Sequence, residues 1–392
     1  MAQSILGMPV VMDDYRNDIP MSLYVHVPWC EKKCLYCDFN SHPIKGSVPQ
    51  EKYFELLLSD LEVSMAAVGT REIESVFFGG GTPSVIAPEL YQYFLERLQK
   101  QYTLKNDIEI TLEANPGTSD WKKFRDYRAA GINRLSIGIQ TFDDDLLRKI
   151  GRVHSSGEAQ RAIADARGLF DNLNVDLMFA LPGQKLTDVK EDLQKVLDVG
   201  PDHISIYQLT IEPNTWFARF PPALPADDVS SGMQFEIESV TGALGYENYE
   251  VSAFAKDGFR CRHNLNYWQF GDYLGIGAGA HSKLTSKHGV VRSARFKQPK
   301  KYMESAADGN QLQSKDAISS KELPFEFFMN GFRLREGVSI DLFESRTGLS
   351  FQKIRPIIDD LCERGLTKYS ERNIKTTNLG SRFLNDVLQQ FL

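Results

Sequence analysis

The first half of the sequence alternates short β-rich runs with amphipathic helical stretches, and this alternation constrains the fold more than any other feature. Six strands are expected, at 22–28, 75–80, 108–114, 134–140, 174–181 and 203–210. The helices between and around them are expected at 50–68, 87–101, 118–130, 143–150, 156–169 and 186–199. A repeated β–α order favours a parallel sheet with right-handed crossovers. The sequence therefore predicts an α/β fold, either an open doubly wound sheet or a TIM-like barrel with fewer strands.

Polar and glycine residues cluster at the ends of the predicted strands. Cys30 follows the first strand, Gly79 to Thr82 follow the second, and Glu113 and Gln140 lie at the ends of the third and fourth. Parallel α/β folds place their active sites where the carboxyl ends of the strands meet. A binding or catalytic site is therefore expected at this end of the sheet.

The overall charge argues against nucleic acid as the main ligand. The 392 residues include 45 Lys or Arg and 52 Asp or Glu, which gives a net charge of -7. This sign is unfavourable for binding phosphate backbones. The stretch 1–20 lacks a basic start and a long apolar core, and no later run approaches the roughly 20 apolar residues of a spanning helix. A cytosolic protein is expected, with peripheral contact with a membrane left open.

The second half of the sequence departs from the β–α order. Its expected elements are a helix at 227–245, a strand at 246–254 and a loop-rich stretch at 258–283. From about 316 the chain is typical of a small helical domain, in which a helix-turn-helix and a hairpin at 366–377 resemble a winged helix. Residues 320–392 hold 11 Lys or Arg and 10 Asp or Glu. This near-neutral charge argues against a DNA-reading wing and favours a lid or a partner-docking surface.

Three of the five cysteines, Cys30, Cys34 and Cys37, lie within eight positions. A structural zinc site needs four ligands, and His26 and His42 could complete one. A cubane iron–sulfur cluster is normally held by four thiolates, so three leave one iron open to a chelating ligand such as an amino acid. Three incidental buried cysteines are the remaining alternative. The odd count and the clustering argue against a disulfide framework.

The spacing CxxxCxxC and the glycine stretch "GGGTP" (79–83) match the radical S-adenosylmethionine (SAM) superfamily. Further sequence motifs resemble those of the anaerobic coproporphyrinogen III oxidase group, called HemN-like, over residues 20–390. They are "YVHVPWCEKKCLYCDFNSH", "EANPG", "INRLSIGIQTF", "GRVHS", "VDLMFALPGQ" and "YQLTIEPNT". The resemblance implies a partial (β/α)6 TIM-like radical SAM barrel with a small C-terminal winged-helix-like domain. It also implies a [4Fe-4S] cluster and SAM as cofactors.

Two features distinguish branches within this group. The oxidases carry a further cysteine two positions after the third cluster ligand, where this chain has Phe39. "HNLNYW" (263–268) is similar to the HNxxYW motif of the heme-chaperone branch, called HemW. The resemblance thus implies a heme carrier that delivers heme to respiratory cytochromes, with no catalytic residue assigned. The alternative is an oxygen-independent coproporphyrinogen III oxidase acting in heme biosynthesis.

The same resemblance divides the chain into four segments and assigns its site residues. The expected segments are an N-terminal extension (1–20), the radical SAM partial barrel (21–225), a barrel-completing segment with the HNxxYW motif (226–315) and a C-terminal HemN-type domain (316–392). The expected cluster ligands are Cys30, Cys34 and Cys37. The expected SAM contacts are Tyr24, Tyr36, Gly80, Gly81, Thr82, Glu113, Gln140, Arg152 and Asp176.

The expected heme ligand is His263, with Cys261 and His281 as alternatives; Tyr267 and Trp268 could pack on a porphyrin face. Several of the expected contacts also have a purely structural interpretation. Tyr24 could be an inward-facing strand residue, Arg152 a surface charge and Asp176 a cap or ion-pair partner.

Overall fold

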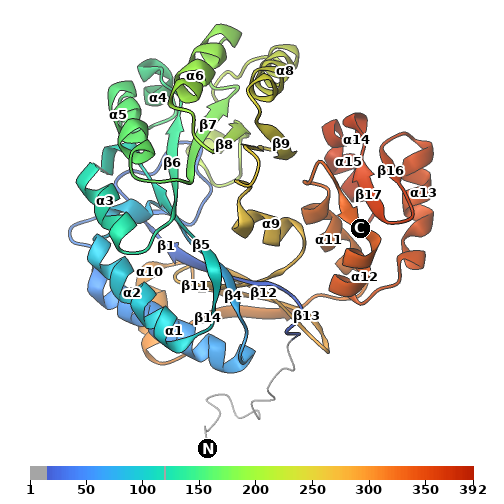
Figure 1. The fold of residues 1–392 in the computed structure, drawn as a ribbon, viewed down its shortest axis with the longest axis horizontal. Helices are drawn as coiled ribbons and strands as arrows, with labels where there is room; N and C mark the ends of the chain where they lie inside the picture. The colour runs from blue at the N-terminus through green and yellow to red at the C-terminus, as the bar shows by residue number, and fades with distance from the viewer. Residues whose placement is uncertain (1–15, 119–120) are drawn as a thin grey trace, which may run out of the picture.

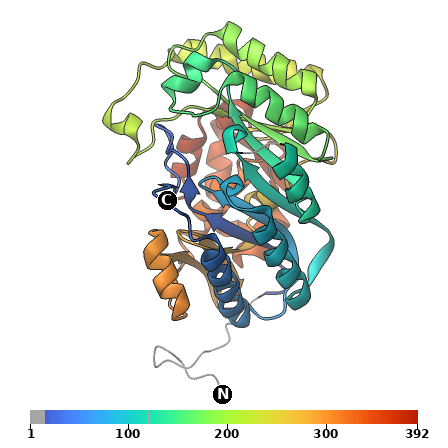
Figure 2. The same cartoon turned by 90° about the vertical axis from the view of Figure 1, so that its left-hand side faces the viewer.

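A computed structural model describes residues 16–118 and 121–392 of the chain. All six predicted strands are present, and each pairs in parallel with the next. They are β1 (Met21–Val27), β4 (Ile73–Gly80), β5 (Leu104–Ala114), β6 (Arg134–Gln140), β7 (Leu173–Phe179) and β8 (His203–Gln208). The predicted helices follow as α1 (Gln50–Val68), α2 (Pro88–Gln101), α3 (Trp121–Ala129), α4 (Asp144–Lys149), α5 (Ser156–Arg167) and α6 (Leu186–Val199). They cover the outside of the sheet, coloured blue to green in Figures 1 and 2.

The parallel strands curve into a partial barrel that further strands extend at both edges. On one side β11 (Asp272–Ile276) pairs in parallel with β1, and three antiparallel strands follow it. These are β12 (His281–Ser286), β13 (Gly289–Arg295) and β14 (Leu312–Ala317). On the other side β8 pairs with β10 (Ala253–Ala255), which pairs with β9 (Glu247–Glu250). The expected TIM-like barrel with fewer strands is thus confirmed, and the doubly wound alternative is wrong.

Each barrel strand alternates apolar residues facing the helices with polar residues facing the interior. In β6, Leu135, Ile137 and Ile139 are fully buried in the main core. Arg134, Ser136, Gly138 and Gln140 line the internal cavities instead. Because side chains alternate with period 2 along a strand, the outer face binds the helices while the inner face is free to build a site.

Two expectations for the second half were wrong in detail. The expected strand 246–254 is two strands, because the chain reverses at Val251 and Ser252, where the Glu250 carboxylate accepts hydrogen bonds from the N–H and hydroxyl of Ser252 (both 3.0 Å). The stretch 258–283, expected to be loop-rich, contains helix α9 (Arg262–Trp268), β11 and the start of β12. The helix expected at 227–245 is confirmed as α8 (Asp227–Ala243).

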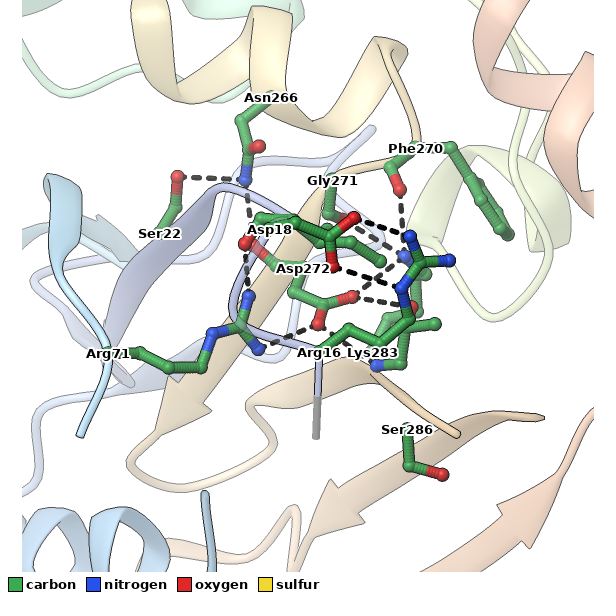
Figure 3. Close-up of polar contacts among 12 residues, drawn as sticks. Arg16, Asp18, Ser22, Arg71, Asn266, Phe270, Gly271, Asp272, Lys283 and Ser286 are labelled. Carbon is green, nitrogen blue, oxygen red and sulfur yellow. Dashed lines mark hydrogen bonds and ion pairs between the residues drawn. The ribbon is translucent and has the colours of Figure 1, made fainter. Parts of the chain in front are cut away.

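A buried ion network ties the start of β1 to β11 and β12 (Figure 3). The Asp272 carboxylate accepts hydrogen bonds from Arg71 (2.8 Å), Lys283 (3.0 Å) and the Thr285 hydroxyl (2.8 Å), and it is fully buried. Burial lowers the pKa of Lys283 to about 8. Arg16 pairs with Asp18 and donates to the carbonyl of Ser345 in the C-terminal domain. Since removing one member of a buried pair costs roughly 3–5 kcal/mol, the Asp272 pairs strongly hold β11 to β12 and to Arg71, whereas Arg16 adds only a more exposed contact with the C-terminal domain.

The C-terminal domain, red in Figure 1, has its own apolar core and lies beside the barrel with α9 between them. The expected hairpin is confirmed as β16 (Thr367–Tyr369) and β17 (Asn373–Thr376), and β15 (Val338–Ser339) adds a third strand. The helices are α11 (Leu323–Gly331), α12 (Ile340–Thr347), α13 (Arg355–Glu363), α14 (Asn378–Arg382) and α15 (Leu384–Gln389). The expected start of this domain at 316 falls inside β14, and residues 1–15 of the expected N-terminal extension lie outside the described residues.

Candidate functional site in the barrel interior

Two adjoining cavities occupy the inside of the barrel. The upper cavity, of about 140 Å³, lies at the carboxyl ends of the strands and is lined by Cys30, Cys34 and Cys37. The lower cavity, of about 260 Å³, is lined by residues of α9, including His263. Glu113, Ser136 and Asp176 line both cavities and form their common wall. The prediction of a site at the carboxyl ends of the strands therefore agrees with where the upper cavity lies.

The three clustered thiols come from the loop that follows β1 and converge on the upper cavity. Cys30 lies in the short strand β2 (Trp29–Cys30), which pairs with β3 (His42–Pro43) and closes the loop. Burial and the neighbouring thiols of Cys34 and Cys37 raise the pKa of Cys30 to about 11, and burial also raises the pKa of Cys37. All five cysteines of the chain are free. Three converging thiols fit a cluster held at three irons, and binding of iron would favour the thiolate forms that burial disfavours.

The histidines of the zinc alternative are engaged elsewhere. The Nδ1 of His26 lies 3.0 Å from the Tyr24 hydroxyl, and its Nε2 lies 2.9 Å from the Asn40 carbonyl oxygen. The Nε2 of His42 lies 3.3 Å from the Asn40 side-chain oxygen. Within residues 16–118 and 121–392, no three Cys, His, Asp or Glu side chains are grouped to hold a single metal ion. A cluster spreads its ligands over separate irons and so requires a wider spacing than one ion does.

The glycine stretch packs directly against the cysteine loop, with no room for a side chain at Gly80 or Gly81. A Cβ on Gly81 would lie 2.5 Å from the Trp29 carbonyl oxygen, and one on Gly80, where φ is +119°, would lie 2.5 Å from the His26 ring. The N–H groups of Gly80, Gly81 and Thr82 donate to Glu113, Val27 and Trp29, respectively. These N–H groups are therefore engaged within the protein rather than free for a ligand. The glycines allow the close approach of β4 to the cysteine loop, and they line the upper cavity.

Arg152 lies inside the upper cavity rather than on the surface. Its guanidinium donates to the Cys34 sulfur (3.6 Å) and to the Gly138 carbonyl (2.5 Å). Tyr36 lines the same cavity, and burial raises its pKa. Gln140 reaches the cavity because a β-bulge shifts the register after Gly138 and gives Gln140 a φ of 73°. A bulge at a strand end is a usual way to redirect a side chain toward a site.

The common wall contains two carboxyl groups with perturbed pKa values. Burial and the adjacent Asp176 raise the pKa of Glu113 to about 7, against the stabilising N–H of Gly80. Burial likewise raises the pKa of Asp176, whose oxygens accept hydrogen bonds from Asn174 (2.8 Å) and Ser136 (3.4 Å). Glu113 can therefore gain or lose a proton near neutral pH, which suits a group that faces a charged ligand.

The motif "HNLNYW" forms α9, which packs at the amino ends of the strands, opposite the cysteine loop. Glu109 of β5 caps the helix by accepting the N–H groups of Arg262 and His263 (both 3.1 Å). Asn266 donates to the Ser22 hydroxyl (2.9 Å) and to the Asp272 carbonyl (2.7 Å). Part of the motif therefore closes the floor of the barrel, a structural role that the sequence pattern does not indicate.

His263 has one ring nitrogen without a partner. Its Nδ1 lies 2.9 Å from the Ser75 hydroxyl, whereas its buried Nε2 has no hydrogen-bond partner among the residues that the structure describes. Burial, and then the charge of Arg134, lower the pKa of His263 to about 3. A neutral imidazole with an unused nitrogen fits the requirement for a heme ligand. The rings of Phe77 (4.9 Å between centroids) and Tyr267 (5.2 Å) pack around it, so one of them must move before a large ligand reaches that nitrogen.

The other candidates for heme contact are placed differently. Cys261, which directly precedes α9, is fully buried with its sulfur 3.6 Å from Glu109, and His281 is exposed at the start of β12; neither lines the upper or the lower cavity. Tyr267 stacks on Tyr273 (4.2 Å between centroids), and the Trp268 ring lies 4.3 Å from the Arg333 guanidinium. Tyr267 and Trp268 nevertheless line the lower cavity. Tyr24, expected at the SAM site, lines the lower cavity beside Glu113.

Several lining residues were not predicted from the sequence. They are Phe77, Arg134, Ser136, Asn174, Ser205 and Tyr207, with Lys33 at the upper cavity. Ser136 and Arg134 lie four and six positions before Gln140, and Asn174 lies two positions before Asp176 on the same strand, so the period of 2 would have indicated these three. Ser205 and Tyr207 lie on β8, where no site residue was predicted.

Comparison with known proteins identifies the family. Residues 24–196 match the Radical SAM superfamily, which implies a [4Fe-4S] cluster and SAM as cofactors, and residues 318–383 match the HemN C-terminal domain. The solved structure of coproporphyrinogen III oxidase (HemN) from Escherichia coli shares the fold, with a TM-score of 0.82 and 21% identity over 97% of this chain and 92% of that one.

Relatives with higher identity cover nearly the whole chain. A heme chaperone HemW of Escherichia coli (strain K12) is 44% identical over 375 residues, which cover 95% of this chain and 98% of that protein. One of Bacillus subtilis (strain 168) is 34% identical over 379 residues, covering 95% and 99%. The mitochondrial radical S-adenosyl methionine domain-containing protein 1 of Bos taurus is 36% identical over 385 residues, covering 95% and 87%. The chain therefore belongs to the HemW family of the radical SAM superfamily.

Proposed function

We propose that this protein is a heme chaperone that binds heme together with a [4Fe-4S] cluster and SAM and delivers heme to respiratory cytochromes. The observation that carries the proposal is the 44% identity, over 95% of this chain, to a protein named heme chaperone HemW. The unpartnered Nε2 of His263, inside a cavity that adjoins the three thiols, supports it from the geometry.

We assign the cluster to Cys30, Cys34 and Cys37, and SAM to the upper cavity, its common wall and Tyr24, which lines the lower cavity beside Glu113. The proposed SAM contacts are Tyr24, Tyr36, Gly80, Gly81, Thr82, Glu113, Gln140, Arg152 and Asp176. When bound, the cluster and SAM supply one-electron chemistry. Arg152 places a positive charge 3.6 Å from the Cys34 sulfur. Glu113 and Asp176 provide carboxyl groups that can face a cationic ligand.

We assign His263 as the axial heme ligand, with Tyr267 and Trp268 beside it in the lower cavity. Because Phe77 and Tyr267 pack around the imidazole, binding requires that the aromatic side chains of this cavity rearrange. Trp268 contacts Arg333 of the C-terminal domain, so a movement of α9 would be transmitted to that domain through this contact. We therefore propose that the C-terminal domain, from about residue 316, acts as a lid or partner-docking surface. It follows the partial barrel (21–225) and its completing segment (226–315) in the sequence.

The site of action is proposed to be the cytoplasm, with transient contact with membrane-bound acceptors. Within the part of the chain that the structure describes, no helix combines the length and the apolar character needed to cross a membrane.

One anaerobic experiment separates this function from coproporphyrinogen III oxidation. The protein is reconstituted with iron and sulfide, supplied with SAM and a reductant, and incubated either with heme or with coproporphyrinogen III. Stable heme binding without formation of protoporphyrinogen is expected. Conversion of coproporphyrinogen over several turnovers would contradict the chaperone proposal. Phe39→Cys restores the cysteine of the oxidases at an exposed position, and we expect no oxidase activity from that change alone.

A further inference from the structure

Arg134 carries a buried cationic group without a hydrogen-bond or ion-pair partner among the described residues. The residue is 2% exposed, and its Nε has no hydrogen-bond partner. No hydrogen bond or ion pair joins its guanidinium to any residue of 16–118 or 121–392. Nearby acidic groups, including Glu109 and Asp176, stabilise this cation through space and raise its pKa, but buried hydrogen-bond donors in folded proteins normally also have a partner. The exception at Arg134 therefore points to a partner outside the chain.

The acidic residues near Arg134 are committed to other contacts. Glu109 accepts the N–H groups of Arg262 and His263 at the start of α9. Asp176 accepts hydrogen bonds from Asn174 and Ser136. Both carboxylates act on Arg134 through space, but neither forms an ion pair with it. The guanidinium thus keeps its donors available on the side of the cavity.

The lower cavity has the composition of a site for an aromatic acid. Arg134 is a lining residue, together with the rings of Tyr24, Phe77, Tyr267 and Trp268. Its volume of about 260 Å³ is below the roughly 300–1,000 Å³ of pockets that bury a drug-sized ligand. As it stands, the cavity fits one edge of a large flat molecule rather than the whole of it.

We propose that Arg134 binds a carboxylate of the ligand of the lower cavity, namely one propionate of heme, so that the propionate-bearing edge of the porphyrin enters the barrel. This inference rests on the proposed heme-chaperone function and adds a second anchor to the His263 nitrogen. A guanidinium can bind a carboxylate with two parallel hydrogen bonds, which fixes orientation as well as affinity. Arg134 would then select porphyrins that carry a free acid at that edge.

The test compares heme with its dimethyl ester, in which both propionates are neutral, by absorption titration of the reconstituted protein. Esterification is expected to weaken binding to the wild type by roughly 10- to 100-fold, the usual effect of losing a charge-assisted hydrogen bond. Arg134→Gln should bind heme about as weakly as the wild type binds the ester, and esterification should then have little further effect.

Arg260→Gln is the matched control, because Arg260 precedes α9 but pairs with Glu247 (2.8 Å) and Glu336 (3.2 Å) and lines neither cavity. It should discriminate between heme and ester as the wild type does. Equal binding of heme and ester by the wild type would overturn the inference and leave the chaperone function intact, and this comparison decides the matter even if Arg134→Gln fails to fold. Full discrimination by a folded Arg134→Gln would also overturn it. Absence of heme binding by the wild type would overturn both proposals.

Discussion

Replacing Gly81 by alanine tests whether the glycine stretch exists to hold the cysteine loop. The added Cβ would lie 2.5 Å from the Trp29 carbonyl oxygen, whereas ordinary contact begins at 3.4 Å, so the loop must retreat by about 0.9 Å. The hydrogen bond from the Thr82 N–H to the same carbonyl (2.8 Å) would be stretched or lost. Because Trp29 directly precedes Cys30, this retreat displaces a proposed cluster ligand.

The expected cost follows from these two changes. Overpacking against backbone atoms costs roughly 1–3 kcal/mol, and a lost hydrogen bond adds about 1 kcal/mol. The barrel core is untouched, so we expect Gly81→Ala to fold, to unfold at a lower temperature and to retain less iron and sulfide after anaerobic reconstitution. The measurements are thermal unfolding of the apoprotein by circular dichroism, and iron and sulfide per chain.

Gly232→Ala provides the control for this prediction. Gly232 lies within α8, and a Cβ there meets no atom within 4 Å. Alanine at such a position is expected to be neutral or to stabilise the helix by up to about 1 kcal/mol. If Gly81→Ala matched Gly232→Ala in both stability and cluster content, the steric reasoning would be refuted.

Three further predictions concern the cavities. Cys34→Ala should fold but lose the iron–sulfur absorption, and retained iron and sulfide after reconstitution would refute the ligand assignment. His263→Ala should weaken heme binding by roughly tenfold or more, about 1.4 kcal/mol, with cluster content unchanged. Unchanged affinity would contradict the assignment and favour Cys261 or His281 as the ligand. Glu113 has its pKa raised from 4.5 to about 7, so its carboxyl favours the folded state below pH 4.5 and loses this effect as the pH rises through 7. Raising the pH from 5 to 8 should therefore lower the free energy of unfolding of the wild-type apoprotein by up to about 3 kcal/mol more than that of Glu113→Gln, at about 1.4 kcal/mol per pKa unit. Identical pH profiles of the two proteins in urea unfolding would contradict this.

The β–α alternation was sufficient to predict the six parallel strands and their helices, because each element of that half is long enough to show its own period. It left a doubly wound sheet and a barrel as alternatives, and only the family resemblance favoured the barrel. The prediction failed at 258–283, where order depends on distant residues. The short helix α9 begins where Glu109, more than 150 positions away, accepts its first N–H groups. Its residues show no helical apolar stripe, since Asn266 and His263 face polar partners in the barrel interior. A tertiary cap of this kind leaves no local signal in the sequence.

Some residues of the site could be predicted from the sequence and others could not, for a similar reason. The cysteines and glycines are marked by their spacing, and the structure brings them to one cavity. Arg134 carries no such mark, because an arginine at the start of a strand is usually a surface charge. Only its inward register and the absence of a partner among the described residues distinguish it, and the second property exists only in three dimensions.

The two cavities cannot be electrostatically independent, because Glu113 and Asp176 face both of them. A cation in the upper cavity favours the ionised form of these carboxyl groups, while burial and their mutual repulsion favour the neutral form. The charge that results is also the charge seen by a ligand in the lower cavity. If both cavities are filled as proposed, the free energies of SAM binding and of heme binding both depend on the protonation of Glu113 and Asp176. By thermodynamic linkage, each ligand therefore alters the affinity for the other by the same factor.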